Sequence, residues 1–334
     1  MLNNQFEESF QLAQQTLELA LSIADHKSIS LTYIAEGKAQ YKLLSFEEAL
    51  NSFEKAYEIS FHYSYFQASI ESLFHCGNCH YKLGQFHLAK RYYERVIDKS
   101  HSAKTGIEIY YQARLYLGST LYYLGDIQQS NQMHKHLYYE LHYYSYPFIK
   151  IDAVLGLAWS SHQLGNTPLA MSLSNQIREL SLQNGSYNLD RIETNYGVFL
   201  CKMGSSENVF DLWNKAFATF ESNDDRIAQA TVKEEIALQF LKLENIDLAE
   251  SSLLEALILL GLADEIYFRG RIYRILGTVA EKRHDKQNAL QWYRLALQCL
   301  HMTKSKVELY LTQTLIESLA TLDFNHKTAE ELPD

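Results

Sequence analysis

The sequence predicts an all-α protein, an α-solenoid built from helix-turn-helix repeats. Three observations support this: a small residue returns about every forty positions, a second marker follows each by twelve residues, and only three prolines occur in 334 residues. The first series is Gly37, Gly77, Gly118, Ala158, Gly197, Ala237 and Gly277. The second is Ala49, Ala89, Ser130, Ala170, Val209, Ala249 and Ala289. An internal period of this length indicates stacked units, because one unit cannot bury its apolar face alone.

Each repeat is expected to contain a first helix (helix A), a tight turn and a second helix (helix B). Residues 46–56 have apolar side chains three and four apart, the spacing of an amphipathic helix. Ser45 and Glu48 have capping-box spacing, and so do Asp126 and Gln129. Of the seven residues that directly precede a helix B, all except Gln85 are candidate capping residues: Ser45, Asp126, Asn166, Ser205, Asn245 and Asp285. Glycines suited to a left-handed turn stand before four of these seven positions: Gly84, Gly125, Gly165 and Gly204.

The two ends of the array are expected to differ from its middle. Residues 1–24 are predicted to form an orphan helix B, because 6–10 match 46–50 at the forty-residue period. Residues 25–303 then form seven helix pairs, residues 304–322 a solvated capping helix, and residues 323–334 a flexible tail. The orphan helix carries more apolar residues than one face can hide, so Phe6 and Phe10 are candidate interface residues. Either a second copy of the chain or an upstream domain is expected to cover it.

Composition excludes several functions. A net charge of −10 argues against a nucleic-acid partner, whose phosphates need a basic surface. No apolar run reaches the roughly 20 residues of a membrane span, and no signal peptide is recognisable. Four cysteines suit a reduced, cytoplasmic setting. No nucleotide loop, nucleophile elbow or paired carboxylates occur, so we expect no enzyme.

Two motifs could suggest a metal or a cofactor. Residues 76–80 spell C-x-x-C-H, the pattern of c-type haem attachment, and C-x-x-C also occurs in zinc and redox sites. The repeat explains the motif instead, because Gly77 is the periodic glycine and Cys76 and Cys79 fall on core positions. Around His134, several histidines share a helix, but His134 occupies the slot of an inward aromatic residue. We therefore expect neither metal nor cofactor. The tyrosine-rich segment 138–146 is an alternative contact surface.

The pattern resembles the tetratricopeptide repeat. The family's alternation of small and aromatic residues is present in Gly77, Gly84, Phe86, Ala89 and Tyr93. The period of forty exceeds the usual period of about 34 residues, and the proline that closes the standard unit is missing. Longer, proline-free units resemble the sensor arrays of bacterial regulators, such as the peptide-pheromone receptors and the maltose-activator type. The resemblance implies a right-handed superhelix whose A helices line a concave groove.

The resemblance also implies a function, the binding of a protein or peptide along this groove. Carried over by register, the groove slots hold Lys38, Tyr41, Lys42, Asn78, Tyr81, Lys82, Tyr122, Tyr123 and Trp159. Two other readings of this surface stay open: the lysines are simply solvated helix ends, and the tyrosines pack helix A against helix A. An alternative function is the sensor part of a bacterial regulator whose output domain lies outside this chain. A co-activator of a phosphatase or another enzyme is the third.

Overall fold

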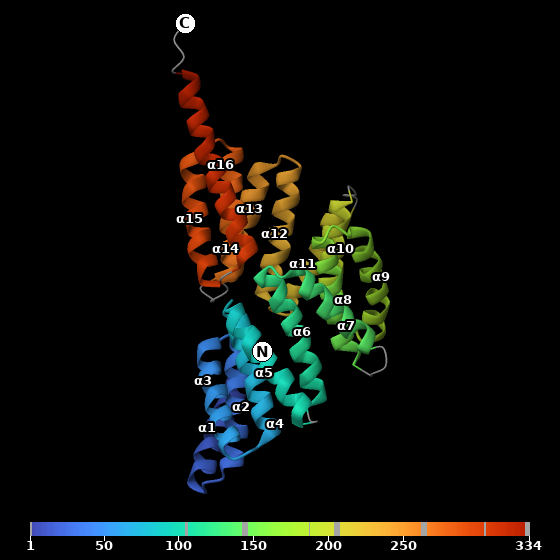
Figure 1. The fold of residues 1–334 in the computed structure, drawn as a ribbon, viewed down its shortest axis with the longest axis vertical. Coiled ribbons are helices and arrows are strands. Elements are labelled where there is room, and N and C mark those ends of the chain that lie inside the picture. The colour runs from blue at the N-terminus through green and yellow to red at the C-terminus, as the bar shows by residue number, and fades with distance from the viewer. Residues whose placement is uncertain are drawn as a thin grey trace. The chain divides into compact units, whose positions relative to one another are not determined.

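A computed structural model describes residues 2–103, 106–141, 146–186, 188–203, 208–261, 266–303 and 305–330, and these contain sixteen α-helices (Figure 1). The helices are α1 (Leu2–Ser22), α2 (His26–Lys42), α3 (Phe46–His62), α4 (Phe66–Lys82), α5 (Phe86–Ala103), α6 (Ile107–Leu124), α7 (Ile127–Glu140), α8 (Pro147–Gln163), α9 (Thr167–Gln183), α10 (Leu189–Lys202), α11 (Val209–Ser222), α12 (Arg226–Lys242), α13 (Ile246–Leu260), α14 (Ile266–Lys282), α15 (Lys286–Thr303) and α16 (Lys306–Glu330). The prediction of an all-α fold of paired helices is confirmed.

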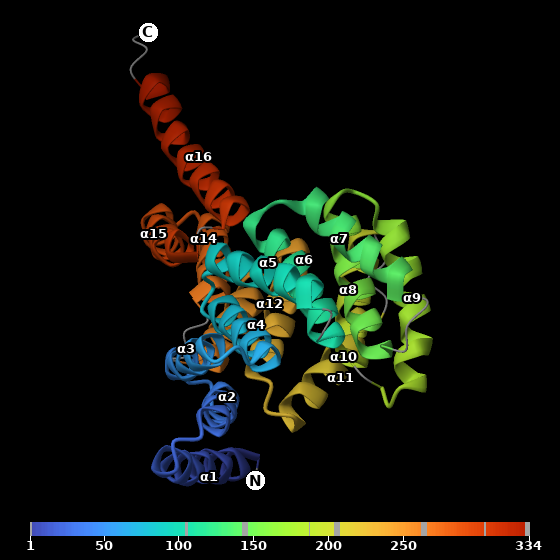
Figure 2. The ribbon, with the colours of Figure 1, turned by 60° about the horizontal axis from the view of Figure 1, so that its bottom comes forward.

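The chain divides into two compact units. Unit 1 contains residues 1–122 and 126–156, and unit 2 contains residues 123–125 and 157–334. In unit 1, α1 packs on α2, and α2 and α3 form the first helix pair (Figure 2). In unit 2, the pairs α10–α11, α12–α13 and α14–α15 follow one another, and α16 packs on α15. The cores of both units therefore lie between consecutive helices, as stacked repeats require.

The periodic small residue is explained by the ring that packs against it. A Cβ added to Gly37 would lie 2.8 Å from the ring of Phe53, sixteen residues later, and one added to Gly77 would lie 2.8 Å from Tyr93. The same spacing relates three further pairs: Gly118 with His134, Gly197 with Trp213, and Gly277 with Tyr293. Where the small residue is an alanine, the residue sixteen positions later is smaller, and all four are buried: Ala158 with Ser174, and Ala237 with Leu253. Helix A therefore has a small residue at each point where a larger side chain of helix B packs against it.

The turns between the helices of a pair contain a residue with positive φ, whether or not that residue is glycine. Gly84, Gly125 and Gly165 do adopt positive φ, between 68° and 90°, and Gly204 lies outside the described residues. The equivalent turn residues in two other repeats are Leu44 (φ 64°) and Glu244 (φ 59°). A left-handed conformation at such side chains is strained, so the packing of the two helices imposes the turn.

The predicted capping boxes are wrong. Ser45 and Asp126 precede α3 and α7, but neither side chain makes a capping hydrogen bond. Asn166 does cap α9, because its side chain accepts from the backbone N–H of Leu169 at 3.2 Å. Asp285 likewise accepts from the N–H of Asn288 at 3.1 Å. Ser205 lies outside the described residues.

The C-terminal helix differs from the predicted solvated cap over residues 304–322. α16 runs from Lys306 to Glu330, so residues 323–330 are helical, and residues 331–334 lie outside the described part of the chain. Glu308 and Thr312 lie within the segment that was expected to be a solvated cap, but both are buried. They lie one turn apart and therefore share the face that packs inward. Among the described residues, no helix is long and apolar enough to cross a membrane.

Candidate functional site

The A helices of unit 1 carry a row of half-buried tyrosines. Tyr41 near the end of α2 packs edge-on against Phe46, with ring centroids 5.2 Å apart. Tyr81 occupies the same slot in α4 and packs against Phe86 of the next helix B and Tyr116 of α6, both at 5.7 Å. The open reading that tyrosines join one helix A to the next is thus supported by Tyr81. The row is both a packing element and a partly exposed aromatic surface.

The polar residues of this surface are less available than the sequence suggests. Lys38 on α2 forms an ion pair with Glu71 on α4, with 2.6 Å between Nζ and Oε1. Asn78 is 8% exposed, and its side-chain oxygen accepts a hydrogen bond of 2.8 Å from the Tyr93 hydroxyl. Both residues therefore hold helices together. Lys42 is exposed and Lys82 is half-buried.

The nine predicted groove residues do not fall in one compact unit. Seven belong to unit 1, and we call them the A-helix surface: Lys38, Tyr41, Lys42, Asn78, Tyr81, Lys82 and Tyr122. Tyr123 and Trp159 are grouped with unit 2. There Trp159 packs against His162 and Phe199, with ring centroids 5.7 Å away in each case. Trp159 thus belongs to a local aromatic core.

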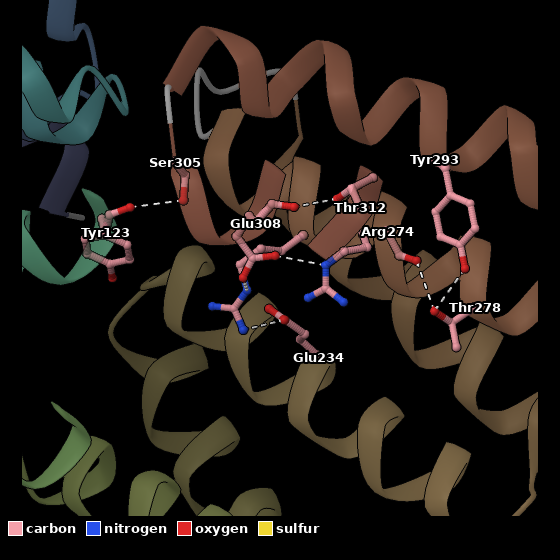
Figure 3. Close-up of polar contacts among 9 residues, drawn as sticks. Tyr123, Glu234, Arg274, Thr278, Tyr293, Ser305, Glu308 and Thr312 are labelled. Atoms are coloured by element: carbon pink, nitrogen blue, oxygen red, sulfur yellow. Dashed lines mark hydrogen bonds and ion pairs between the residues drawn. The ribbon is translucent and has the colours of Figure 1, made fainter. Parts of the chain in front are cut away.

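Unit 2 contains a charged network that links three A-type helices. Arg271 of α14 pairs with Glu234 of α12 at 2.6 Å and with Glu308 of α16 at 3.8 Å. Arg274, one turn further along α14, pairs with the same Glu308 at 2.9 Å (Figure 3). These side chains are at most 18% exposed, so water screens their charges weakly. The forty-residue register places Glu234, Arg271 and Arg274 on one face of the A helices, but it does not reveal that Glu308 of the capping helix pairs with both arginines.

Glu235, next to Glu234, is a second buried carboxyl group. It is 8% exposed, and no hydrogen bond or ion pair involves it among the described residues. Burial, and after it the negative charge of Glu234, raise its pKa to about 7, although the charges of Arg271 and Lys202 act in the opposite direction. The carboxyl therefore changes protonation near neutral pH.

The cysteine and histidine motifs have the structural roles that their repeat positions predict. Cys76 and Cys79 are buried in the core of unit 1, and burial raises the pKa of the Cys79 thiol to about 12. Such thiols are poor nucleophiles and poor metal ligands. His134 is 1% exposed and packs where Gly118 and Gly156 leave room. Among the described residues, no three His, Cys, Asp or Glu side chains gather into a metal site. Residues 142–145 of the tyrosine-rich segment lie outside the described part.

The exposed apolar side chains of the first helix are not those of Phe6 and Phe10. Phe6 and Phe10 are half-buried on the side of α1 that also holds the buried Ala13 and Ala20. The exposed apolar side chains of this segment, 53–66% exposed, are Leu12, Leu19, Leu21 and Ile23. Leu12, Leu19 and Ile23 share one helical row, because they are seven and four residues apart. Phe6 and Phe10 therefore lie on a different face of α1 from this exposed row.

Comparison with known proteins agrees with the fold. A tetratricopeptide-repeat family model matches residues 71–100, which contain most of α4 and α5. This segment of the chain thus matches the tetratricopeptide repeat, and the fold of paired helices resembles those of the Rap and NprR regulators. No curated protein matches the sequence.

Three solved structures illustrate the likeness. The Rap conjugation gene regulator of plasmid pLS20, in complex with the Phr* peptide, is 16% identical, with 84% of this chain and 76% of that chain covered and a TM-score of 0.68. NprR from B. thuringiensis, in its apo form, is 12% identical over 88% and 83%, with a TM-score of 0.66. Aspartyl phosphate phosphatase F from Bacillus subtilis is 12% identical over 85% and 73%, with a TM-score of 0.60. Identities this low establish the fold alone.

Proposed function

We propose that this chain is a non-enzymatic binding module whose A-helix surface in unit 1 holds an extended peptide or a segment of a partner protein. One observation carries the proposal: half-buried tyrosines recur on consecutive A helices, with Lys42 and Lys82 directly beside them. Rigid aromatic rings supply contact area at low entropic cost, and lysines can bind a carboxylate or backbone carbonyl groups. Stacked repeats present such residues at regular intervals along a surface.

The fold comparisons favour the second candidate, a sensor in a bacterial signalling or transcriptional regulator. The Rap regulator of pLS20 was solved with the Phr* peptide, and NprR was solved with its cognate peptide NprX. Both candidates require a peptide-binding surface, and they differ in whether an output domain acts on the bound state. A phosphatase is also among the similar structures, but the tetratricopeptide-repeat fold is typical of binding modules. We propose a cytoplasmic location, which suits four unpaired cysteine thiols.

Two further elements of the proposal concern assembly and cofactors. We propose that the row formed by Leu12 and Leu19 of α1 and by Ile23 directly after it, rather than Phe6 and Phe10, is covered by a second copy of the chain or by another domain. The binding function proposed here needs neither a metal nor a cofactor, because aromatic and lysine side chains carry the recognition.

The test begins with selection of peptide ligands. Immobilised full chain would be used to select peptides from a displayed library, and affinities of the selected synthetic peptides would be measured by fluorescence anisotropy. We expect Lys42→Glu to weaken binding by about tenfold, roughly the loss of one favourable charge contact. The control is Lys135→Glu on α7, which reverses an equally exposed charge on a helix B and should leave affinity unchanged. Equal losses in both variants would contradict the assigned surface.

A further inference from the structure

Lysine ends many of the A helices of this chain and none of the described B helices. It is the last residue of five A helices: Lys42 (α2), Lys82 (α4), Lys202 (α10), Lys242 (α12) and Lys282 (α14). The helices in B positions are α1, α3, α5, α7, α9, α11, α13 and α15, and none has a lysine or arginine in its last turn. The helix dipole stabilises a cation near the C-terminus of either kind of helix. The dipole therefore does not explain why these lysines are confined to the A helices.

Three of these lysines belong to unit 2 and lie on consecutive A helices. Lys202, Lys242 and Lys282 occupy the same slot of the forty-residue repeat, and α12 contacts both α10 and α14. The ammonium group of Lys242 donates to the carbonyl oxygen of Cys201 at 2.9 Å, so it lies beside the residue that precedes Lys202. The three side chains thus form a row across the ends of α10, α12 and α14, which we call the lysine row.

The ammonium groups of the lysine row have no carboxylate partner. All three side chains are exposed, and none takes part in an ion pair among the described residues. Two carboxylates of α13, Asp247 and Glu250, both pair with Arg283 instead. Glu281 is half-buried, and Glu244 is exposed in the turn after α12, yet neither forms an ion pair within the described part of the chain. Exposed ammonium groups repeated at one slot and left without carboxylates favour an anionic partner.

We propose that the lysine row binds an extended acidic segment of a partner protein, in which aspartate or glutamate recurs at every third residue. Packed neighbouring helices lie about 8–10 Å apart, and this distance sets the spacing of the lysines. A polyproline II segment has three residues per turn and rises about 3.1 Å per residue, so side chains on one of its faces are about 9 Å apart. Each lysine can therefore meet one carboxylate of such a segment.

A protein segment suits the lysine row better than a nucleic acid does. Nucleic acids need a concentrated basic surface, whereas this row has one lysine per helix on a chain of net charge −10. The row lies wholly in unit 2. The proposal therefore goes beyond the peptide surface of unit 1 and stands whether or not that surface binds a ligand.

The test separates the spacing of the carboxylates from their charge. The spaced peptide is Glu-Pro-Pro-Glu-Pro-Pro-Glu, and the clustered peptide is Pro-Pro-Glu-Glu-Glu-Pro-Pro, which has the same composition. Both would carry a neutral fluorophore at the N-terminus and an amide at the C-terminus. Their binding to the full chain would be measured by fluorescence anisotropy at low ionic strength, where screening is weak. We expect the spaced peptide to bind at least about fivefold more tightly than the clustered peptide.

Matched variants locate the site. Lys202→Gln/Lys282→Gln should abolish the preference for the spaced peptide and keep the fold, because both side chains are exposed. The control Lys215→Gln/Arg294→Gln removes two exposed charges from α11 and α15 of the same unit and should retain the preference. The unit 1 variant Lys42→Glu should retain it as well.

Four results would overturn the inference: equal binding of the two peptides, an unchanged preference in the variant of the lysine row, loss of the preference in either of the other two variants, or no saturable binding up to about 10 mM. Tighter binding of an oligothymidylate than of the spaced peptide would also overturn it, because it would assign the row to a nucleic acid.

Discussion

The forty-residue period of this chain reflects a contact between two residues in each repeat, one small and one large. Gly37 lacks a side chain where the ring of Phe53 occupies the space, and Phe53 is fully buried and stacks on His75 at 4.8 Å. In another repeat the same two positions hold Ala237 and Leu253, both buried. A small residue with a large ring and a larger residue with a shorter side chain are two solutions to one packing problem.

This complementarity predicts non-additive mutations. Gly37→Ala should destabilise the protein by about 1–3 kcal/mol, because its Cβ would overlap the Phe53 ring. Phe53→Leu alone should also destabilise it through a cavity. The double variant, which reproduces the Ala237–Leu253 combination, should lose clearly less than the sum of the two single variants. Urea denaturation of the four proteins measures this, and strict additivity would show that the two positions are not coupled.

His134 makes the stability of unit 1 dependent on pH. Burial lowers the pKa of its imidazole to about 4 from the ordinary 6.5, because the charged form loses water. In the unfolded chain the imidazole takes up a proton already near pH 6.5. The contribution of neutral His134 is therefore fully present above pH 6.5 and is lost as the pH falls toward about 4.

The variant His134→Phe should reduce this acid sensitivity. Phenylalanine occupies the same slot at Phe53, and its ring matches the space left by the facing glycine. Between about pH 7 and about pH 5, the free energy of unfolding of the wild type should fall by roughly 2 kcal/mol more than that of His134→Phe. His136→Gln, an exposed substitution on the same helix, is the control and should behave as the wild type. Parallel pH profiles for wild type and His134→Phe would contradict the assignment.

At the scale of elements, the ion pairs of α14 and α16 are expected to hold α16 in place. Arg274 and Glu308 are 18% and 11% exposed, so removal of the arginine leaves a carboxylate with little water to solvate it. Arg274→Met should cost about 1–3 kcal/mol and should speed amide hydrogen exchange in α16. The control is Arg283→Met, whose partners Asp247 and Glu250 are 91% and 33% exposed and remain in contact with water, and it should cost less than about 1 kcal/mol. Similar costs would show that the network does not stabilise α16.

The face of α1 gives a prediction about assembly. Charges placed on the exposed row by Leu12→Glu/Leu19→Glu should leave the fold intact and convert any dimer to monomer, because both side chains are more than 60% exposed. Phe6→Glu/Phe10→Glu should instead lower thermal stability, because these rings are half-buried. Light scattering and thermal melting of both variants separate the effects. A wild-type chain that is monomeric at all concentrations would rule out a second copy on this face.

Sequence periodicity predicts elements better than it predicts contacts. The sixteen-residue spacing from Gly37 to Phe53 predicts helix A, the turn and helix B. It does so because a small side chain must face a large one wherever the two helices pack closely. Register also places Tyr41 and Tyr81 correctly in one slot. It does not reveal that Lys38 pairs with Glu71, or that Asn78 accepts from Tyr93, since a lysine or an asparagine on a helix is compatible with solvent as well.

At the scale of the whole molecule, the candidate residues are divided between two units. The sequence treats the repeats as equivalent, so it places Tyr81 and Trp159 on one continuous surface. In the structure Tyr81 belongs to unit 1 and Trp159 to unit 2. The half-buried tyrosines lie in unit 1, whereas the buried ion pairs of Arg271 and Arg274 lie in unit 2. We therefore expect ligand variants to act on one unit at a time.

The central claim is that ligands bind to helix A and not to helix B. Hydrogen–deuterium exchange of the full chain, with and without a saturating selected peptide, tests it most directly. Exchange should slow in α2, α4 and α6 and stay unchanged on the outer faces of α3 and α5, because the A-helix surface is formed by the former three helices. Protection confined to α3 and α5, or no protection by any selected peptide, would contradict it.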